Sequence, residues 1–209
     1  MIRHLIWDFD GTLYDTYPAI AAAYAQTLEA CGFSVGFDEI MAQITVSMGH
    51  ARSYFDAKFG LPDGFDARLQ SLRRSAEMSL ARPFPGAEET LRAWLAQGGT
   101  NDILTHRSRS IHALLEKHGF DSLIRACVTS DDGFPRKPDP AGLRWLLETY
   151  AMRPDETLMV GDRPLDIEAG KNAGVRTCFF DPAGKGGADA DFTVRDFTGL
   201  RTLLNIGSE

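Results

Sequence analysis

Apolar residues recur along the chain with two different periods, and the change between them divides the sequence. A short apolar run at residues 2–7 is typical of a buried strand. Over residues 17–82 the apolar positions follow helical spacing instead, which predicts helices at about 20–31, 38–45, 51–59 and 66–80. No convincing strand pattern occurs in that block. We therefore expect an all-helical insertion that follows a single strand.

From residue 83 onward, apolar runs alternate with helical patterns. The sequence Arg-Pro-Phe-Pro-Gly at 82–86 is typical of a hinge. Strands are then predicted at 103–104, 126–128, 157–160 and 177–180, and helices around 91–95, 111–118, 143–150, 164–173 and 200–204. Such alternation favours an α/β fold, a Rossmann-like doubly wound parallel sheet with helices on both faces. We assign residues 1–15 and 83–209 to this core and 16–82 to the helical insertion.

Composition narrows the range of partners. The chain of 209 residues has 44% apolar and 24% charged residues and a net charge of −7, which disfavours nucleic acid as a partner. We see neither an apolar run long enough to span a membrane nor a signal region. Cys31, Cys127 and Cys178 show no metal-ligand spacing, so we expect buried free thiols in a reducing compartment. These features predict a cytoplasmic monomer or homodimer without a membrane partner.

Two acidic residues follow the first predicted strand. Asp8 and Asp10 leave the strand at its carboxyl end, where open α/β sheets bind ligands, and Gly11 permits a sharp turn. Acids gathered at a strand end repel one another unless a cation or a proton compensates them. An ordinary Asp-Gly turn explains the dipeptide alone, so the pair by itself leaves both interpretations open.

Further polar residues follow three later strands. Thr105 precedes a helix predicted to begin near residue 108, where its hydroxyl can hold a phosphate oxygen or simply cap the helix. Lys137 lies beside two prolines and is either a phosphate-binding cation or a solvated loop lysine. Asp162 ends an apolar strand, and Asp166 follows one helical turn later. A carboxylate there suits Mg²⁺, although a helix cap also explains Asp162 alone.

Taken together, these segments resemble the four motifs of the haloacid dehalogenase superfamily. Asp8-Phe9-Asp10-Gly11-Thr12, Thr105, Lys137-Pro138, and Gly161-Asp162 with Asp166 occur in the family's order. The resemblance implies that Asp8 is the nucleophile, that Asp10 is the acid and base, and that Thr105 and Lys137 bind the phosphoryl group. It further implies Mg²⁺ bound by Asp8, Asp162 and the Asp10 backbone carbonyl, with Asp166 orienting Lys137 or a metal-bound water. The insertion resembles the helical cap of phosphoglycolate phosphatases and β-phosphoglucomutases.

The activity that this resemblance implies is a Mg²⁺-dependent phosphatase acting on a small-molecule phosphomonoester. Phosphoglycolate is our first candidate substrate and a sugar phosphate the second. A phosphosugar mutase shares all four motifs and stays open; Asp10 disfavours a dehalogenase, and the intact motifs disfavour a non-catalytic binding protein. The residues that we expect to contact substrate are Tyr14, Tyr17, Ser47, His50, Arg52 and His106. An exposed helix start explains His50 and Arg52 equally well.

Overall fold

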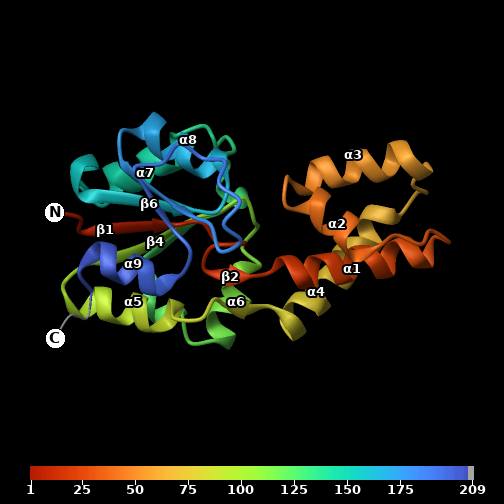
Figure 1. The fold of residues 1–209 in the computed structure, drawn as a ribbon, viewed down its shortest axis with the longest axis horizontal. Helices are drawn as coiled ribbons and strands as arrows, with labels where there is room; N and C mark the ends of the chain where they lie inside the picture. The colour runs from red at the N-terminus through yellow and green to blue at the C-terminus, as the bar shows by residue number, and fades with distance from the viewer. Residues whose placement is uncertain (207–209) are drawn as a thin grey trace. The chain divides into compact units, whose positions relative to one another are not determined.

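The computed structural model describes residues 1–206, and the chain divides into two compact units (Figure 1). One unit comprises Met1–Tyr14 and the chain from Pro83 onward, and the other comprises Asp15–Arg82. The predicted breaks lay after Asp15 and residue 82, whereas the first break in the structure lies after Tyr14. Residues 207–209, which the sequence assigned to the core, lie outside the described residues.

A six-stranded parallel sheet forms the centre of the first unit. Its strand order is β5-β4-β1-β6-β7-β8, with every neighbouring pair parallel. The strands are β1 (His4–Trp7), β4 (Thr100–Leu104), β5 (Ala126–Val128), β6 (Thr157–Gly161), β7 (Arg176–Phe180) and β8 (Phe192–Val194). The sequence predicted all of these except β8, a three-residue edge strand. The central position of β1, between β4 and β6, follows from the crossovers of a doubly wound sheet.

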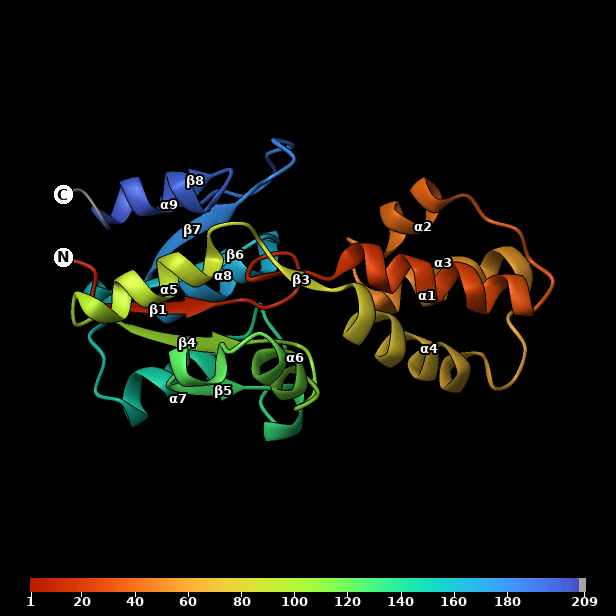
Figure 2. The same ribbon diagram turned by 90° about the horizontal axis from the view of Figure 1, so that it is seen from below.

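Helices cover both faces of this sheet (Figures 1 and 2). They are α5 (Ala87–Ala96), α6 (Ile111–Lys117), α7 (Ala141–Thr149), α8 (Pro164–Ala173) and α9 (Phe197–Leu204). Side chains alternate between the faces of a strand. Accordingly Ile6 belongs to a buried cluster with Leu143 and Leu146 of α7, whereas Trp7 stacks on Phe197 of α9 with ring centroids 5.8 Å apart. The predicted fold class is confirmed.

Four helices build the second unit. They are α1 (Tyr17–Ala30), α2 (Phe37–Ile44), α3 (Met48–Phe59) and α4 (Phe65–Leu80). Tyr24 lies in their core with Phe55 and Phe65, at ring-centroid distances of 5.7 and 6.0 Å. The chain leaves and rejoins the first unit through two short paired strands, β2 (Tyr14–Asp15) and β3 (Arg82–Pro83). The expectation of no strand as far as residue 82 was therefore wrong at Arg82.

The cysteines and the helices bear on two of the bulk predictions. All three cysteines are free, but only Cys178 is fully buried, and Cys31 and Cys127 are partly exposed. Burial raises the pKa of the Cys127 and Cys178 thiols to about 12, so neither forms a thiolate readily. Within residues 1–206, no helix combines the length and hydropathy that crossing a bilayer requires.

Candidate active site

The carboxyl ends of three adjacent strands bring the predicted catalytic residues to one edge of the sheet. Trp7 of β1 is in register with Ile103 of β4 and with Val160 of β6. Asp8 extends β1 by donating its backbone N–H to the Val160 carbonyl at 2.8 Å, and Thr105 extends β4 in the same way toward β5. Asp8, Thr105 and Asp162 therefore lie at the edge where parallel sheets bind ligands.

A closed turn holds the two acids that follow β1. Gly11 has a φ of +81°, a backbone conformation that favours glycine. Its N–H donates to the Tyr14 carbonyl at 2.8 Å, and the Tyr14 N–H donates to the Phe9 carbonyl at 3.0 Å. The Phe9 and Tyr14 rings stack with centroids 4.5 Å apart. Backbone hydrogen bonds and ring packing thus fix the position of Asp10 after Asp8.

A buried ammonium lies between two carboxylates. Lys137 Nζ is 2.6 Å from Asp8 Oδ1 and 2.6 Å from Asp166 Oδ1, and it donates to the Leu104 carbonyl at 2.9 Å. Its side chain is 1% exposed. Burial alone lowers the pKa of Lys137, but the Asp166 and Asp8 carboxylates outweigh it and raise that pKa. Lys137 is therefore charged, and the two acids compensate its desolvation.

The two oxygens of Asp8 have different surroundings. Oδ1 accepts a hydrogen bond from Lys137, whereas Oδ2 is buried and accepts none from the described residues. The Nη2 atom of Arg163 lies 3.8 Å from Oδ2. Burial and the Asp166 carboxylate raise the pKa of Asp8, while Lys137 and Arg163 oppose that rise. A nucleophilic carboxylate must be ionised, so a further cation beside Oδ2 would favour the reactive form.

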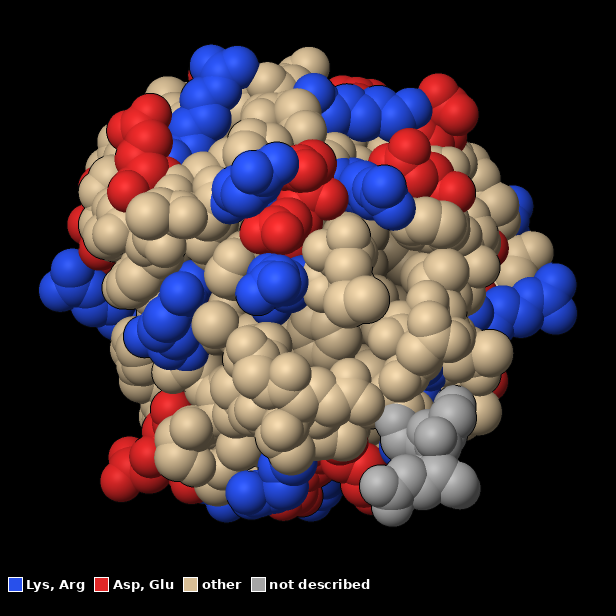
Figure 3. Space-filling model, turned by 90° about the vertical axis from the view of Figure 1, so that its left-hand side faces the viewer, with Lys and Arg blue, Asp and Glu red and all other residues tan. Residues whose placement is uncertain are grey.

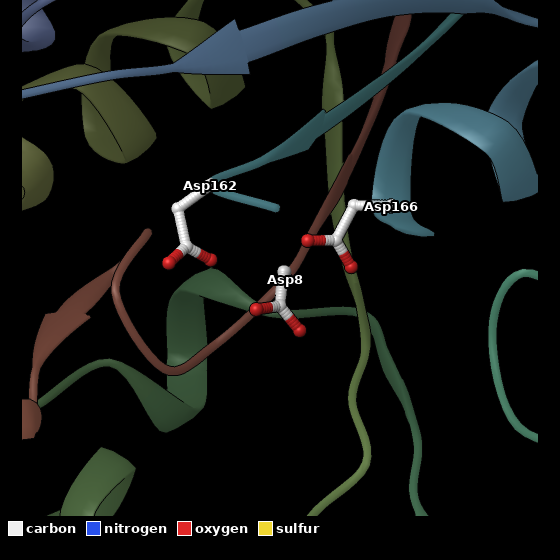
Figure 4. A group of neighbouring side chains, drawn as sticks. All are labelled: Asp8, Asp162 and Asp166. Atoms are coloured by element: carbon white, nitrogen blue, oxygen red, sulfur yellow. The ribbon is translucent and has the colours of Figure 1, made fainter. Parts of the chain in front are cut away.

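The acids of this edge fit a divalent cation. Carboxylate oxygens of Asp8, Asp162 and Asp166 lie within 4.8 Å of one another (Figure 4). Lys137 already occupies the gap between Asp8 and Asp166, and the second Asp166 oxygen accepts the Arg163 backbone N–H at 3.1 Å. Asp8 Oδ2 and the Asp162 carboxylate are therefore the oxygens of this group that could hold a metal. Two carboxylates completed by carbonyl and water oxygens are the hard ligands that Mg²⁺ takes.

The short connection from β6 to α8 requires glycine at position 161. A Cβ atom there would lie 2.3 Å from Asp166 Cβ, closer than any real contact. Asp162 follows directly, and Asp166 is in the first turn of α8 with no exposed surface. Gly161 thus lets the end of β6 approach Asp166 closely enough for both acids to reach Asp8.

Thr105 lies where expected but not at a helix N-terminus. The predicted helix start near residue 108 was wrong, because α6 begins at Ile111. The chain from Thr105 to Ser110 forms a turn, in which the Thr105 hydroxyl accepts the Arg107 N–H at 3.2 Å. Any phosphate contact from this segment must use the hydroxyl and the turn's N–H groups rather than a helix end.

His106 is next to Thr105 and carries no charge. Burial and the positive charges of Lys137 and Arg136 lower its pKa to about 3. Its Nε2 atom is buried and has no hydrogen-bond partner among the described residues. Thr105, His106 and Lys137 all line one cavity of about 240 Å³. His106 is thus a neutral polar group beside the predicted phosphate-binding residues.

The site residues predicted from the sequence did not include two arginines that lie beside them in the structure. Arg107 donates from Nη1 to Asp10 Oδ1 at 2.8 Å, with its guanidinium 5.5 Å from the centre of the Phe9 ring. Arg163 lies 3.8 Å from Asp8 and 4.0 Å from Asp162. A signal was available, because each arginine follows a motif residue within two positions.

The two tyrosines that we expected to contact substrate lie on either side of the point in the sequence where the first unit ends and the second begins. Tyr14 is fully buried, donates its hydroxyl to the Leu114 carbonyl at 3.1 Å and packs against Phe9 and Phe120. The expectation that Tyr14 binds substrate is therefore corrected: its side chain packs the core. Tyr17 is the first residue of α1 and is partly buried.

The remaining candidates lie in the second unit and interact within it. Ser47 caps α3 by accepting the His50 backbone N–H at 2.9 Å, and the His50 ring contacts Gln43 Oε1 at 2.9 Å. Arg52 pairs with Asp66 at 3.0 Å and with Asp56 at 3.1 Å. The helical unit already uses these polar groups, so their role toward substrate stays a prediction.

A larger cavity of about 410 Å³ lies at the opposite, amino-terminal ends of the strands. Its lining includes Arg3, Trp94 and Arg176 and none of the predicted site residues. Figure 3 looks onto this end of the molecule and shows uncharged surface between scattered side chains of both charges. Cavity size alone therefore does not identify the candidate active site. The convergent carboxylates of Asp8, Asp162 and Asp166 identify it instead.

Comparison with known families agrees with this arrangement. The model of the haloacid dehalogenase-like hydrolase family matches residues 5–180, most of the chain. The chain belongs to this family. The resemblance inferred from the four motifs is confirmed, and the protein is an enzyme of the hydrolase class.

Individual relatives of this hydrolase cover most of its length. Phosphoglycolate phosphatase of Vibrio vulnificus (strain YJ016) is 33% identical over 186 residues, which are 83% of this chain and 81% of the relative. N-acetylmuramic acid 6-phosphate phosphatase of Pseudomonas aeruginosa is 31% identical over 183 residues, 84% and 80% of the two chains. The crystal structure of a hydrolase from Streptococcus pneumoniae TIGR4 superposes with a TM-score of 0.71 at 30% identity. The match covers 98% of this chain and 99% of that chain.

Proposed function

We propose that this hydrolase is a Mg²⁺-dependent phosphatase of small phosphorylated metabolites, acting through an aspartyl-phosphate on Asp8. The observation that carries the proposal is the buried Lys137 ammonium, 2.6 Å from both Asp8 and Asp166, beside Asp162 at the same sheet edge. The similarity of the chain to two phosphatases supports a phosphomonoester substrate.

The first half-reaction transfers the phosphoryl group to Asp8. One Asp8 oxygen attacks phosphorus in line, the bond to the leaving oxygen breaks, and Asp10 gives that oxygen a proton. Lys137 and the Thr105 hydroxyl would bind the phosphoryl oxygens as charge develops on them.

The second half-reaction releases inorganic phosphate. Asp10, now a carboxylate, takes a proton from water as the water oxygen attacks phosphorus, and the bond to Asp8 breaks. Asp8 Oδ2, Asp162 and the Asp10 backbone carbonyl would hold the metal, which supplies positive charge beside the phosphoryl oxygens. Asp166 keeps Lys137 in place through an ion pair, with Lys137 Nζ 2.6 Å from Asp166 Oδ1.

Phosphoglycolate is the first substrate to test, because the Vibrio relative is a phosphoglycolate phosphatase. A phosphorylated sugar is the second, since the Pseudomonas relative acts on N-acetylmuramic acid 6-phosphate. We infer that the helical unit acts as a cap that contributes selectivity, while the strand-end residues perform the transfer. Binding energy from such a remote part can serve catalysis at the reacting centre.

A screen of phosphorylated metabolites tests the proposal, with phosphate release as the readout. We expect turnover of at least one alkyl phosphate in Mg²⁺, loss of turnover in excess chelator, and loss in the matched variant Asp8→Asn. Release of a rearranged sugar phosphate instead of inorganic phosphate would show a mutase. Turnover by Asp8→Asn equal to that of the wild type would contradict the proposed mechanism.

A further inference from the structure

The guanidinium of Arg107 holds the carboxylate of Asp10. Arg107 Nη1 donates to Asp10 Oδ1 at 2.8 Å, and the two side chains are 6% and 16% exposed. Hydrogen bonds between charged groups are shorter and stronger than neutral ones, and this one is largely shielded from water. The rotation of the Asp10 carboxylate is therefore restricted, while part of its surface stays accessible.

Arg107 is itself fixed by its surroundings. Its guanidinium carbon lies 5.5 Å from the centre of the Phe9 ring, a cation–π arrangement. Its backbone N–H donates to Thr105 Oγ1 at 3.2 Å, and its carbonyl accepts the Ser130 N–H at 2.7 Å. One turn thus carries both the predicted phosphate-binding hydroxyl and the arginine that contacts Asp10. The relative positions of these two groups are coupled through Arg107.

We propose that Arg107 is a positioning residue, which orients the Asp10 carboxylate for proton transfer to the leaving oxygen. The inference rests on the proposed function, in which Asp10 supplies that proton. As the bond between phosphorus and the leaving oxygen breaks, the proton moves from Asp10 to that oxygen. Asp10 is left as a carboxylate that still accepts the hydrogen bond from Arg107. The arginine itself neither contacts the substrate nor exchanges a proton.

This role makes the effect of Arg107 depend on the leaving group. An alkoxide is strongly basic and requires protonation as it departs, whereas 4-nitrophenolate departs without a proton. Benzyl phosphate and 4-nitrophenyl phosphate are of similar size and differ in this respect. Loss of a purely structural arginine would lower turnover of both substrates alike, because phosphoryl binding and nucleophilic attack are common to them.

The test compares kcat/KM for the two substrates in Arg107→Met. We expect a fall of about tenfold to a hundredfold for benzyl phosphate, part of the 10²–10⁴ that general acid catalysis contributes. For 4-nitrophenyl phosphate we expect a fall of less than about threefold by the same reasoning. Arg107→Lys should recover part of the loss. Arg109→Met is the matched control, because Arg109 is in the same turn with a side chain 67% exposed.

A double-mutant cycle isolates the action through Asp10. In the Asp10→Asn background, Arg107→Met should cause no further loss with benzyl phosphate, because the group that it orients is gone. A further loss of the same size, or equal losses with both substrates in the single variant, would overturn the inference. Should Arg107→Met fail to fold, Arg107→Lys in the same cycle gives the same comparison with smaller effects.

The two proposals fail in different ways. A wild-type protein that releases phosphate in Mg²⁺ from none of the screened metabolites and from neither of these two substrates contradicts the proposed function, and the inference falls with it. A wild-type protein that hydrolyses both, with an Arg107→Met loss independent of the leaving group, contradicts only the role given to Arg107.

Discussion

Replacement of Lys137 by methionine removes the positive charge that lies between two buried acids. Asp8 and Asp166 are 1% and 0% exposed, and oxygens of the two side chains lie within 4.8 Å. At that distance two unit charges repel by about 3.5 kcal/mol at an effective dielectric constant of about 20. Removing one partner of a buried ion pair costs about 3–5 kcal/mol in other proteins, which agrees. We therefore expect Lys137→Met to lose about 3 kcal/mol of unfolding free energy near pH 8, together with turnover.

The loss should depend on pH, and the sign follows from proton linkage. Burial already raises the pKa of Asp8, and without the Lys137 ammonium Asp8 takes up a proton still more readily in the folded state than in the unfolded chain. Stability gained from that proton is present at low pH and is lost as the pH rises through the folded-state pKa. The deficit of Lys137→Met should thus be smaller at about pH 5 than at about pH 8.

Urea unfolding in chelator at the two pH values provides the assay. Lys171→Met is the matched control, because Lys171 pairs with Asp189 at 2.6 Å while its side chain is 42% exposed. A pair so exposed contributes about 0–1 kcal/mol. The double variant Lys137→Met/Asp166→Asn should regain most of the stability but no activity. A Lys137→Met deficit no larger than that of Lys171→Met, or equal at both pH values, would refute the reasoning.

Three further predictions concern Asp162, His106 and the helical unit. Asp162→Ala should need far more Mg²⁺ for activity, because only Asp8 then supplies a carboxylate; a metal titration monitored by phosphate release checks this, and an unchanged midpoint contradicts it. His106, with its pKa lowered to about 3, stays neutral when folded but charges on unfolding below about pH 6.5, so stability falls with pH by at most about 1.4 kcal/mol per unit. In His106→Asn, the free energy of unfolding measured with urea should fall less steeply between about pH 7 and pH 5 than in the wild type. Replacing His50 and Arg52 by alanine should lower kcat/KM for the preferred metabolite about tenfold to a hundredfold and change 4-nitrophenyl phosphate hydrolysis much less; equal losses would assign both residues to folding.

The sequence contained enough to predict the six-stranded sheet except for its edge strand β8. Strands β1, β6 and β7 are buried on both faces, so each is a nearly continuous apolar run. Strand β8 has only three residues, and Thr193 in its middle is exposed, so it lacks that pattern. Strands β2 and β3 have two residues each and exist only because the chain passes the same place twice. Such pairing depends on distant segments rather than on local periodicity.

The site shows the same division between local and distant information. Asp8, Thr105 and Asp162 were predictable because each ends a recognisable strand and parallel strands end at one edge. Lys137 and Arg107 differ from these, since their long side chains are directed by turn conformations that periodicity does not encode. Motif resemblance recovered Lys137 but assigned no role to Arg107, which only its position two residues after Thr105 could have indicated. Tyr14 was misjudged because its position near the hinge says nothing about the direction of its ring, which the packing against Phe9 and Phe120 decides.

Covalent labelling of Asp8 tests the central claim most directly. The protein would be mixed with a phosphomonoester and Mg²⁺, quenched in acid within the first turnover, and reduced with borohydride, which converts an aspartyl-phosphate to homoserine. Peptide mass spectrometry should then find homoserine at position 8, in an amount that rises and decays with the burst of alcohol release. Alcohol release at the same rate with no modification at Asp8, or with homoserine at another aspartate, would contradict the account.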